Sequence, residues 1–93
     1  MAISTARVPT AQAGKYLQQL CKHWSHKLEV SFDDKQGTVR FPVAVATMTA
    51  EPEALLVSIE AEDASVVHQM KDVMARHLDR FAFREAPLTF DWS

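Results

Sequence analysis

Apolar and polar positions alternate along this chain with two periods, and these periods predict its secondary structure. From Ala13 to Trp24 the apolar residues recur at helical spacing, which predicts a helix over about residues 11–25. Thr10 is placed to cap this helix, and Asp63 to cap a second helix, whose apolar side chains keep the same spacing to about Phe81. Each helix should therefore bury one face.

Several other segments alternate with period two, the pattern of half-buried strands. It predicts strands over 3–8, 28–33, 39–45, 54–62 and 88–92. Pro42 lies in the third of these and implies an edge position, a bulge or a bend, because proline cannot donate to a sheet ladder. Short turns between the three middle strands predict an antiparallel meander.

The predicted order β-α-β-β-β-α-β points to an α+β fold. We expect a two-layer sandwich, in which the two amphipathic helices pack on one face of a mainly antiparallel sheet. The chain has 93 residues, of which 47% are hydrophobic, so one core can be buried within one domain over residues 1–93.

Composition restricts the class of protein further. The charge of −2 comes from ten dispersed basic and twelve acidic side chains, which argues against nucleic-acid binding. No apolar stretch approaches the roughly 18 residues of a membrane span, and no export signal opens the chain. A single cysteine allows no internal disulfide. We expect a cytoplasmic protein that binds neither nucleic acid nor membrane.

Candidate metal ligands occur in CKHWSHK, residues 21–27. On a helix, Cys21 and His23 would lie on opposite flanks of the buried stripe, about 160° apart, so they cannot hold one ion together. His23 and His26 are three residues apart and could share a ligand, with His77, from the middle of the apolar stripe of the second helix, as a third donor. The alternative is a surface pair of histidines plus one hydrogen-bonded core histidine.

Cys21 beside Lys22 could serve as a nucleophile. Its helical phase places His23 on the other side, so no base is at hand. We interpret Cys21 as a buried or half-buried small apolar residue, and we favour a protein that is not an enzyme.

Arginines recur every four residues in RHLDRFAFRE, residues 76–85. If the helix continued to Arg84, then Arg76, Arg80 and Arg84 would form a basic stripe able to receive a carboxylate or phosphate. The alternative is salt bridging on a solvated helix face, with Phe81 and Phe83 closing the core.

Four segments together resemble a bacterial family of unknown function, DUF2218. They are ARVPT (6–10), YLQQLCKHWSHKLEV (16–30), the FPV after the first turn, and RHLDRFAFRE. The most specific blocks are LCKHWSHK and HLDRFAFRE. The resemblance implies a small bacterial protein linked to iron handling, because similar domains are sometimes joined to, or encoded beside, siderophore-interacting flavin reductases. It implies no reaction, cofactor or catalytic residue.

Together these patterns predict a non-catalytic binding or accessory domain, possible partners being a small anionic ligand or another protein. Its surface would join the ends of the two helices, with Trp24, Lys27, Arg80, Phe83 and Arg84 in contact with the ligand. No cofactor is predicted on this hypothesis.

The alternative hypothesis is a protein that binds a transition metal or haem through His23, His26 and His77. The oligomeric state stays open, and a homodimer could form along the strand with Pro42 or along the terminal strands.

Overall fold

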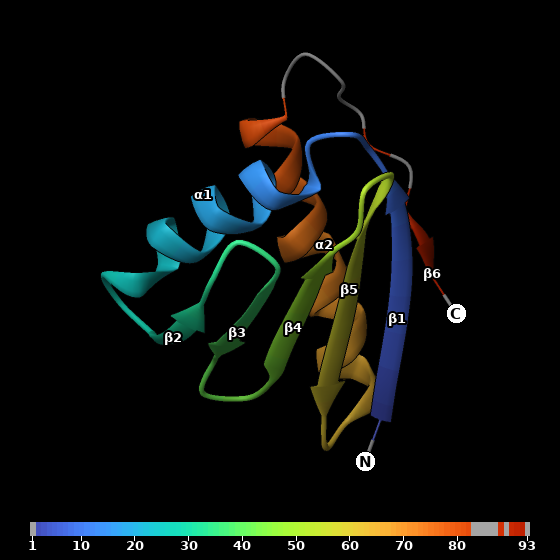
Figure 1. Cartoon of the computed structure of the whole chain (residues 1–93). Coiled ribbons are helices and arrows are strands. Elements are labelled where there is room, and N and C mark those ends of the chain that lie inside the picture. Colours follow the sequence, from blue (N-terminus) through green and yellow to red (C-terminus); the bar gives the residue numbers. More distant parts are fainter. Residues whose placement is uncertain (1, 83–87, 89, 93) are drawn as a thin grey trace.

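The computed structural model describes residues 2–82, 88 and 90–92. Figure 1 shows its helices and strands, coloured along the sequence from blue at the N-terminus to red at the C-terminus. They are β1 (Ala2–Pro9), α1 (Ala13–Ser25), β2 (Glu29–Phe32), β3 (Gln36–Arg40), β4 (Val45–Ala50), β5 (Ala54–Ala61), α2 (Ala64–Phe81) and β6 (Asp91–Trp92).

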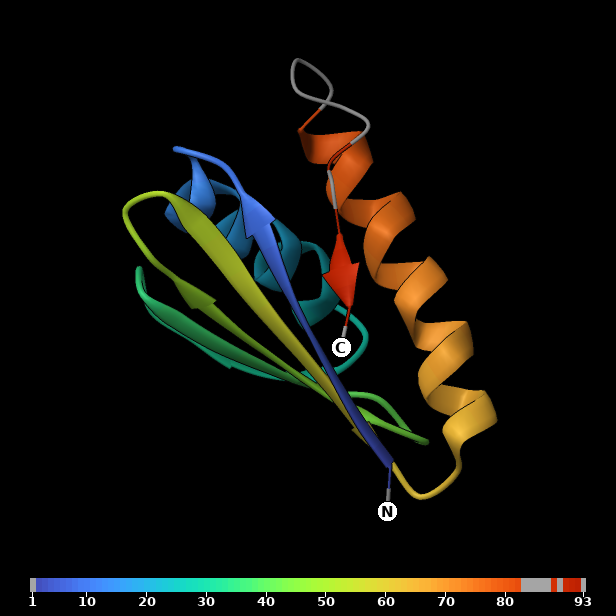
Figure 2. The same cartoon turned by 90° about the vertical axis from the view of Figure 1, so that its right-hand side faces the viewer.

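The strands form one antiparallel sheet in the order β2-β3-β4-β5-β1-β6. Figure 2 shows both helices on the same side of this sheet, so that no helix of the described residues covers the other face. The predicted fold class is therefore confirmed: two amphipathic helices pack on one face of an antiparallel sheet.

One predicted strand is wrong. Residues 39–45 are not a single strand, because β3 ends at Arg40 and β4 begins at Val45. Between them the Phe41 N–H donates to the Ala44 carbonyl oxygen at 2.8 Å, which closes a tight hairpin turn around Pro42. A loop of two residues preserves the period-two alternation on either side of it, so the pattern alone does not reveal the turn. Four strands thus separate the two helices.

The predicted capping residue is confirmed for one of the two helices. Asp63 precedes α2, and its carboxylate accepts a hydrogen bond from the Ser65 N–H at 2.9 Å, as expected of a capping residue. This hydrogen bond lowers the pKa of the Asp63 carboxyl. Thr10, by contrast, does not cap α1: its hydroxyl accepts from the Gln12 N–H at 3.1 Å, before the helix begins.

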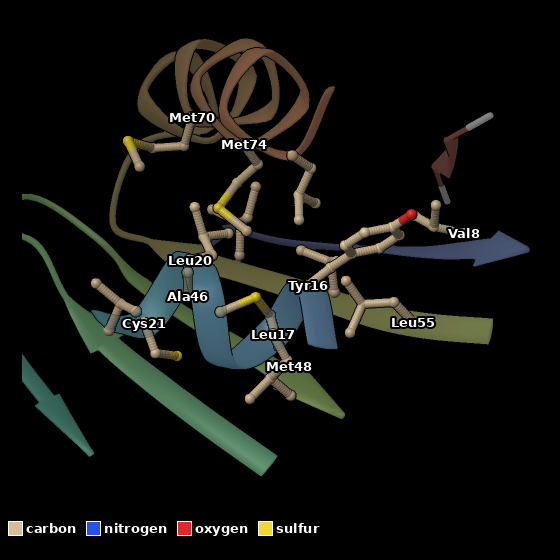
Figure 3. Close-up of a cluster of buried hydrophobic side chains, with 14 of the residues drawn as sticks. Val8, Tyr16, Leu17, Leu20, Cys21, Ala46, Met48, Leu55, Met70 and Met74 are labelled. Atoms are coloured by element: carbon tan, nitrogen blue, oxygen red, sulfur yellow. The ribbon is translucent and has the colours of Figure 1, made fainter. Parts of the chain in front are cut away.

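The core lies between the sheet and the helices, and α1 occupies its centre (Figure 3). Met70 and Met74 reach from α2 toward α1, while Leu17 and Leu20 of α1 are fully or almost fully enclosed. The buried stripe of α2 consists of Val67, Met70, Met74 and Leu78. His77 therefore lies on the flank of that stripe, and its predicted position at the centre is wrong.

The described residues after α2 are attached to it by two polar contacts. The Leu88 N–H donates to the Asp79 carboxylate at 2.9 Å. The Lys71 ammonium lies 5.4 Å from the centre of the Trp92 ring, a cation–π contact between α2 and β6. These contacts hold β6 against β1 in the space beside α2 (Figure 2).

The face of the sheet away from the helices carries one row of hydroxyl residues. The strand registers place side by side one residue of each of five strands, namely Thr5, Ser58, Thr47, Thr38 and Ser31. Threonine suits a solvated strand position because it is β-branched and polar.

The close packing of Gly37 in β3 against α1 can be tested by substitution. A Cβ atom at residue 37 would lie 2.7 Å from the Cys21 sulfur and 3.3 Å from Leu17 Cδ2, so Gly37→Ala should destabilise the fold by about 1–3 kcal/mol. In a Cys21→Ala background the sulfur is gone and the cost should be smaller. Urea unfolding of the single and double variants measures this coupling.

Gly14→Ala is the matched control, because its Cβ would meet the Asp34 carbonyl oxygen at 3.1 Å and not the sulfur. Its effect should add to that of Cys21→Ala. Purely additive costs for Gly37→Ala and Cys21→Ala would contradict the proposed contact.

Candidate functional site

The last turn of α1 meets the second half of α2 through aromatic rings. The His23 ring lies 5.6 Å from His77 and 5.8 Å from Phe81, measured between ring centres. Trp24 lies 5.0 Å from His77 and 5.0 Å from Phe41, which stands in the turn after β3. We call these five residues the helix-end cluster. The two segments singled out in the sequence thus come together in space.

Burial changes across this cluster. Trp24 is buried with 7% of its surface exposed, His77 and Phe81 are half-buried, and His23 is exposed. Trp24 therefore anchors the cluster in the core, while the His23 ring is accessible to a ligand from solvent. Edge-to-face and tilted ring pairs of this kind hold one another in place.

One hydrogen bond determines the tautomer of neutral His77. Its Nδ1 lies 2.7 Å from the carbonyl oxygen of Val73, one turn earlier in α2. A carbonyl oxygen only accepts, so Nδ1 must carry the proton, and in the neutral ring Nε2 keeps the lone pair. His77 can therefore offer Nε2 to a hydrogen-bond donor or a metal ion.

The helical layer is the basic part of the molecule. Residues 11–28 and 64–82 contain six lysine and arginine side chains and two acidic ones, whereas the rest of the chain has four basic and ten acidic residues. Between residues 11 and 28 there is no acidic residue at all. The helical layer therefore carries a net positive charge, although the whole protein is weakly acidic.

The structure describes some of the predicted ligand-binding residues and not others. Lys27 and Arg80 are exposed beside the cluster, Lys27 just after α1 and Arg80 in the last turn of α2. Phe83 and Arg84 lie outside the described residues. α2 ends at Phe81, where its apolar spacing predicted the end, and the stripe that would include Arg84 stays outside the described residues. Arg76 instead pairs with Asp72 at 3.0 Å on the surface.

The predicted metal ligands are only partly brought together. His23 and His77 are in ring contact, but no group of three histidine, cysteine, aspartate or glutamate side chains within the described residues is arranged to hold a metal ion. The set of His23, His26 and His77 is thus not assembled. Metal or haem binding itself stays a prediction.

The family described as an uncharacterized protein conserved in bacteria, DUF2218, matches residues 5–93. The chain belongs to this family. The solved structures include a similar protein, PA4090 from Pseudomonas aeruginosa, determined by NMR. It shares 33% sequence identity with this chain, and the alignment covers 100% of this chain and 96% of PA4090 with a TM-score of 0.85. No curated protein matches.

None of the helices in the described part of this DUF2218 protein is long and apolar enough to cross a membrane. Cys21 is fully buried against Gly37, and burial raises the pKa of its thiol to about 11. A buried thiol with a raised pKa is a poor nucleophile, which agrees with the interpretation of Cys21 as a buried small residue.

Sequence reasoning missed Phe41 as a member of the cluster, because it placed this residue within a strand. The FPV segment that carries part of the DUF2218 resemblance was the available signal. It also missed a hollow of about 500 Å³ on the open face of the sheet, where Thr5, Arg7, Thr47 and Ser58 are among the lining residues. That hollow contains no residue of the helix-end cluster.

The raised pKa of Cys21 predicts a loss of stability in base. The unfolded thiol ionises near pH 8.5, whereas the folded one resists ionisation up to about pH 11, so the free energy of unfolding should fall across this interval. Relative to Cys21→Ala, the wild type should lose about 2–3 kcal/mol between pH 8 and pH 11, measured by urea unfolding. A constant difference would contradict burial of the thiol.

Proposed function

We propose that this protein is a non-catalytic binding domain of the bacterial cytoplasm, with a small anionic ligand at the helix-end cluster. The main observation in support is that ring side chains of two helices converge, namely His23, Trp24, His77 and Phe81. Such a cluster offers rings for apolar contact and imidazole nitrogens for hydrogen bonds, but the described residues supply no ionised nucleophile beside it.

The charge distribution supports an anionic ligand. Lys27 comes three residues after Trp24, Arg80 lies between His77 and Phe81 in the last turn of α2, and both cationic residues are exposed. An arginine can hold a carboxylate or a phenolate through two parallel hydrogen bonds. The acidic residues lie mostly in the turns and strands outside the helical layer.

The resemblance to proteins associated with siderophore-interacting reductases suggests the class of ligand. Iron chelates of the catecholate type are planar, aromatic and anionic, and so match the rings and cations of the surface. The expected contact is stacking on the exposed His23 ring, with Arg80 and Lys27 near the negative oxygens.

Fluorescence of Trp24 provides the test. In a Trp92→Phe background Trp24 is the remaining tryptophan, and the ferric complex of 2,3-dihydroxybenzoate should quench it saturably. Arg80→Ala should weaken this binding about tenfold, because one charged hydrogen-bond donor is lost. Arg7→Ala removes the same charge on the opposite face and is the matched control.

Equal affinity in Arg80→Ala, Arg7→Ala and the parent protein would rule out the proposed contact. Absence of saturable quenching by the ferric complex and by iron-free dihydroxybenzoate would rule out this ligand class. Circular dichroism confirms that each variant is folded.

Metal binding is the second candidate, and the contact between His23 and His77 favours it. Their rings are 5.6 Å apart, and neutral His77 presents Nε2. Elemental analysis and absorption spectra of untagged protein, after incubation with iron, zinc or haem, should then show stoichiometric binding that both His23→Ala and His77→Ala abolish. Binding should weaken in acid, since protonated histidines do not ligate. Stoichiometric metal retained in both variants would exclude this pair.

A further inference from the structure

One edge of the sheet is unoccupied in the described part of the chain. There, β2 pairs with β3 on one side and with no strand on the other. At the opposite end of the sheet, β1 is paired with both β5 and β6. The two edges thus differ: one is partly covered by the end of the chain, and the other exposes backbone donors and acceptors.

The hydrogen bonds of the β2–β3 hairpin show which backbone groups of β2 point away from the sheet. The Asp33 N–H donates to the Gln36 carbonyl oxygen at 2.8 Å, so this pair is hydrogen-bonded. Hydrogen-bonded pairs alternate along antiparallel strands, and Ser31 and Glu29 therefore also direct their backbone groups toward β3. The N–H and C=O groups of Val30 and Phe32 consequently point away from the sheet.

The exposed edge lacks two of the features that usually prevent strand pairing. Residues 28–32, LEVSF, contain no proline and no lysine. Leu28, Val30 and Phe32 share the face that packs toward α1, and Phe32 retains 36% exposure although it is a large apolar residue. An additional strand along this edge would cover that ring.

We propose that a second copy of this chain occupies the edge, with the two β2 strands antiparallel about a two-fold axis at Val30. In this register the Val30 residues exchange both backbone hydrogen bonds, and Leu28 lies opposite Phe32 of the second copy. Glu29 lies opposite Ser31 of the second copy on the other face. The sheet then continues through both copies, and the α1 helices lie side by side above it.

Charge selects this register over its neighbour. Centring on Val30 keeps Glu29 opposite Ser31 and places the start of each β2, which follows Lys27, beside the end of the other β2, which leads to Asp33 and Asp34. Centring on Ser31 would instead bring Glu29 of one copy opposite Asp33 of the other, a pair of like charge. The basic end of α1 and the acidic β2–β3 turn are thus complementary across the axis.

Sedimentation velocity up to millimolar concentration tests the dimer. The wild type should reach a dimer mass and dissociate as salt is raised, because the charged pairs are solvent-exposed. Val30→Pro removes the outward N–H without removing a bond to β3, so the protein should fold but dimerise at least about tenfold more weakly. Val30→Ala keeps the N–H and should dimerise more strongly than Val30→Pro.

Cross-linking reports the register even if Val30→Pro does not fold. In a Cys21→Ala background, a mixture of Glu29→Cys and Ser31→Cys proteins should form a mixed disulfide on oxidation, and Ser31→Cys alone should not. A monomer at every concentration without cross-linking, a dimer unaffected by Val30→Pro, or a Ser31→Cys homodimer would each overturn the proposal. Arg80 has no part in this pairing, so the ligand and dimer tests can fail independently.

Discussion

The packing of α1 against both the sheet and α2 is the constraint on which the other features depend. Leu17, Leu20 and Cys21 of this helix are fully enclosed, and Cys21 fits only because Gly37 of β3 has no side chain. This close approach fixes the rotation of α1 about its axis. Trp24, one turn after Leu20, must then point inward, and His23 beside it must face α2.

Periodicity predicted what depends on local sequence. The amphipathic stripes of both helices and the capping role of Asp63 follow from short-range patterns, and the layered fold follows from their order. The hairpin at Pro42 was not predicted because a two-residue turn leaves the alternation intact. Cys21 was placed on a flank of its helix, since no sequence pattern states how closely Gly37 allows a strand to approach.

The candidate site was predictable in part for the same reason. Two histidine-bearing segments were recognisable in the sequence, but their contact depends on the crossing of α1 over the sheet and on Phe41 in an unpredicted turn. His23 and His77 come from different helices and are in ring contact, but no third ligand joins them within the described residues. A metal site needs three or more converging side chains, which depends on tertiary packing and not on spacing within one segment.

The hydroxyl row on the open face has a consequence for how the protein meets water. Strands lie about 4.8 Å apart, so Thr5, Ser58, Thr47, Thr38 and Ser31 present hydroxyl groups at a regular spacing across the sheet. Stacking another apolar layer on this face would strip hydration from a whole line of polar groups at once. The row of hydroxyl groups therefore opposes the addition of a third layer across the middle of the sheet.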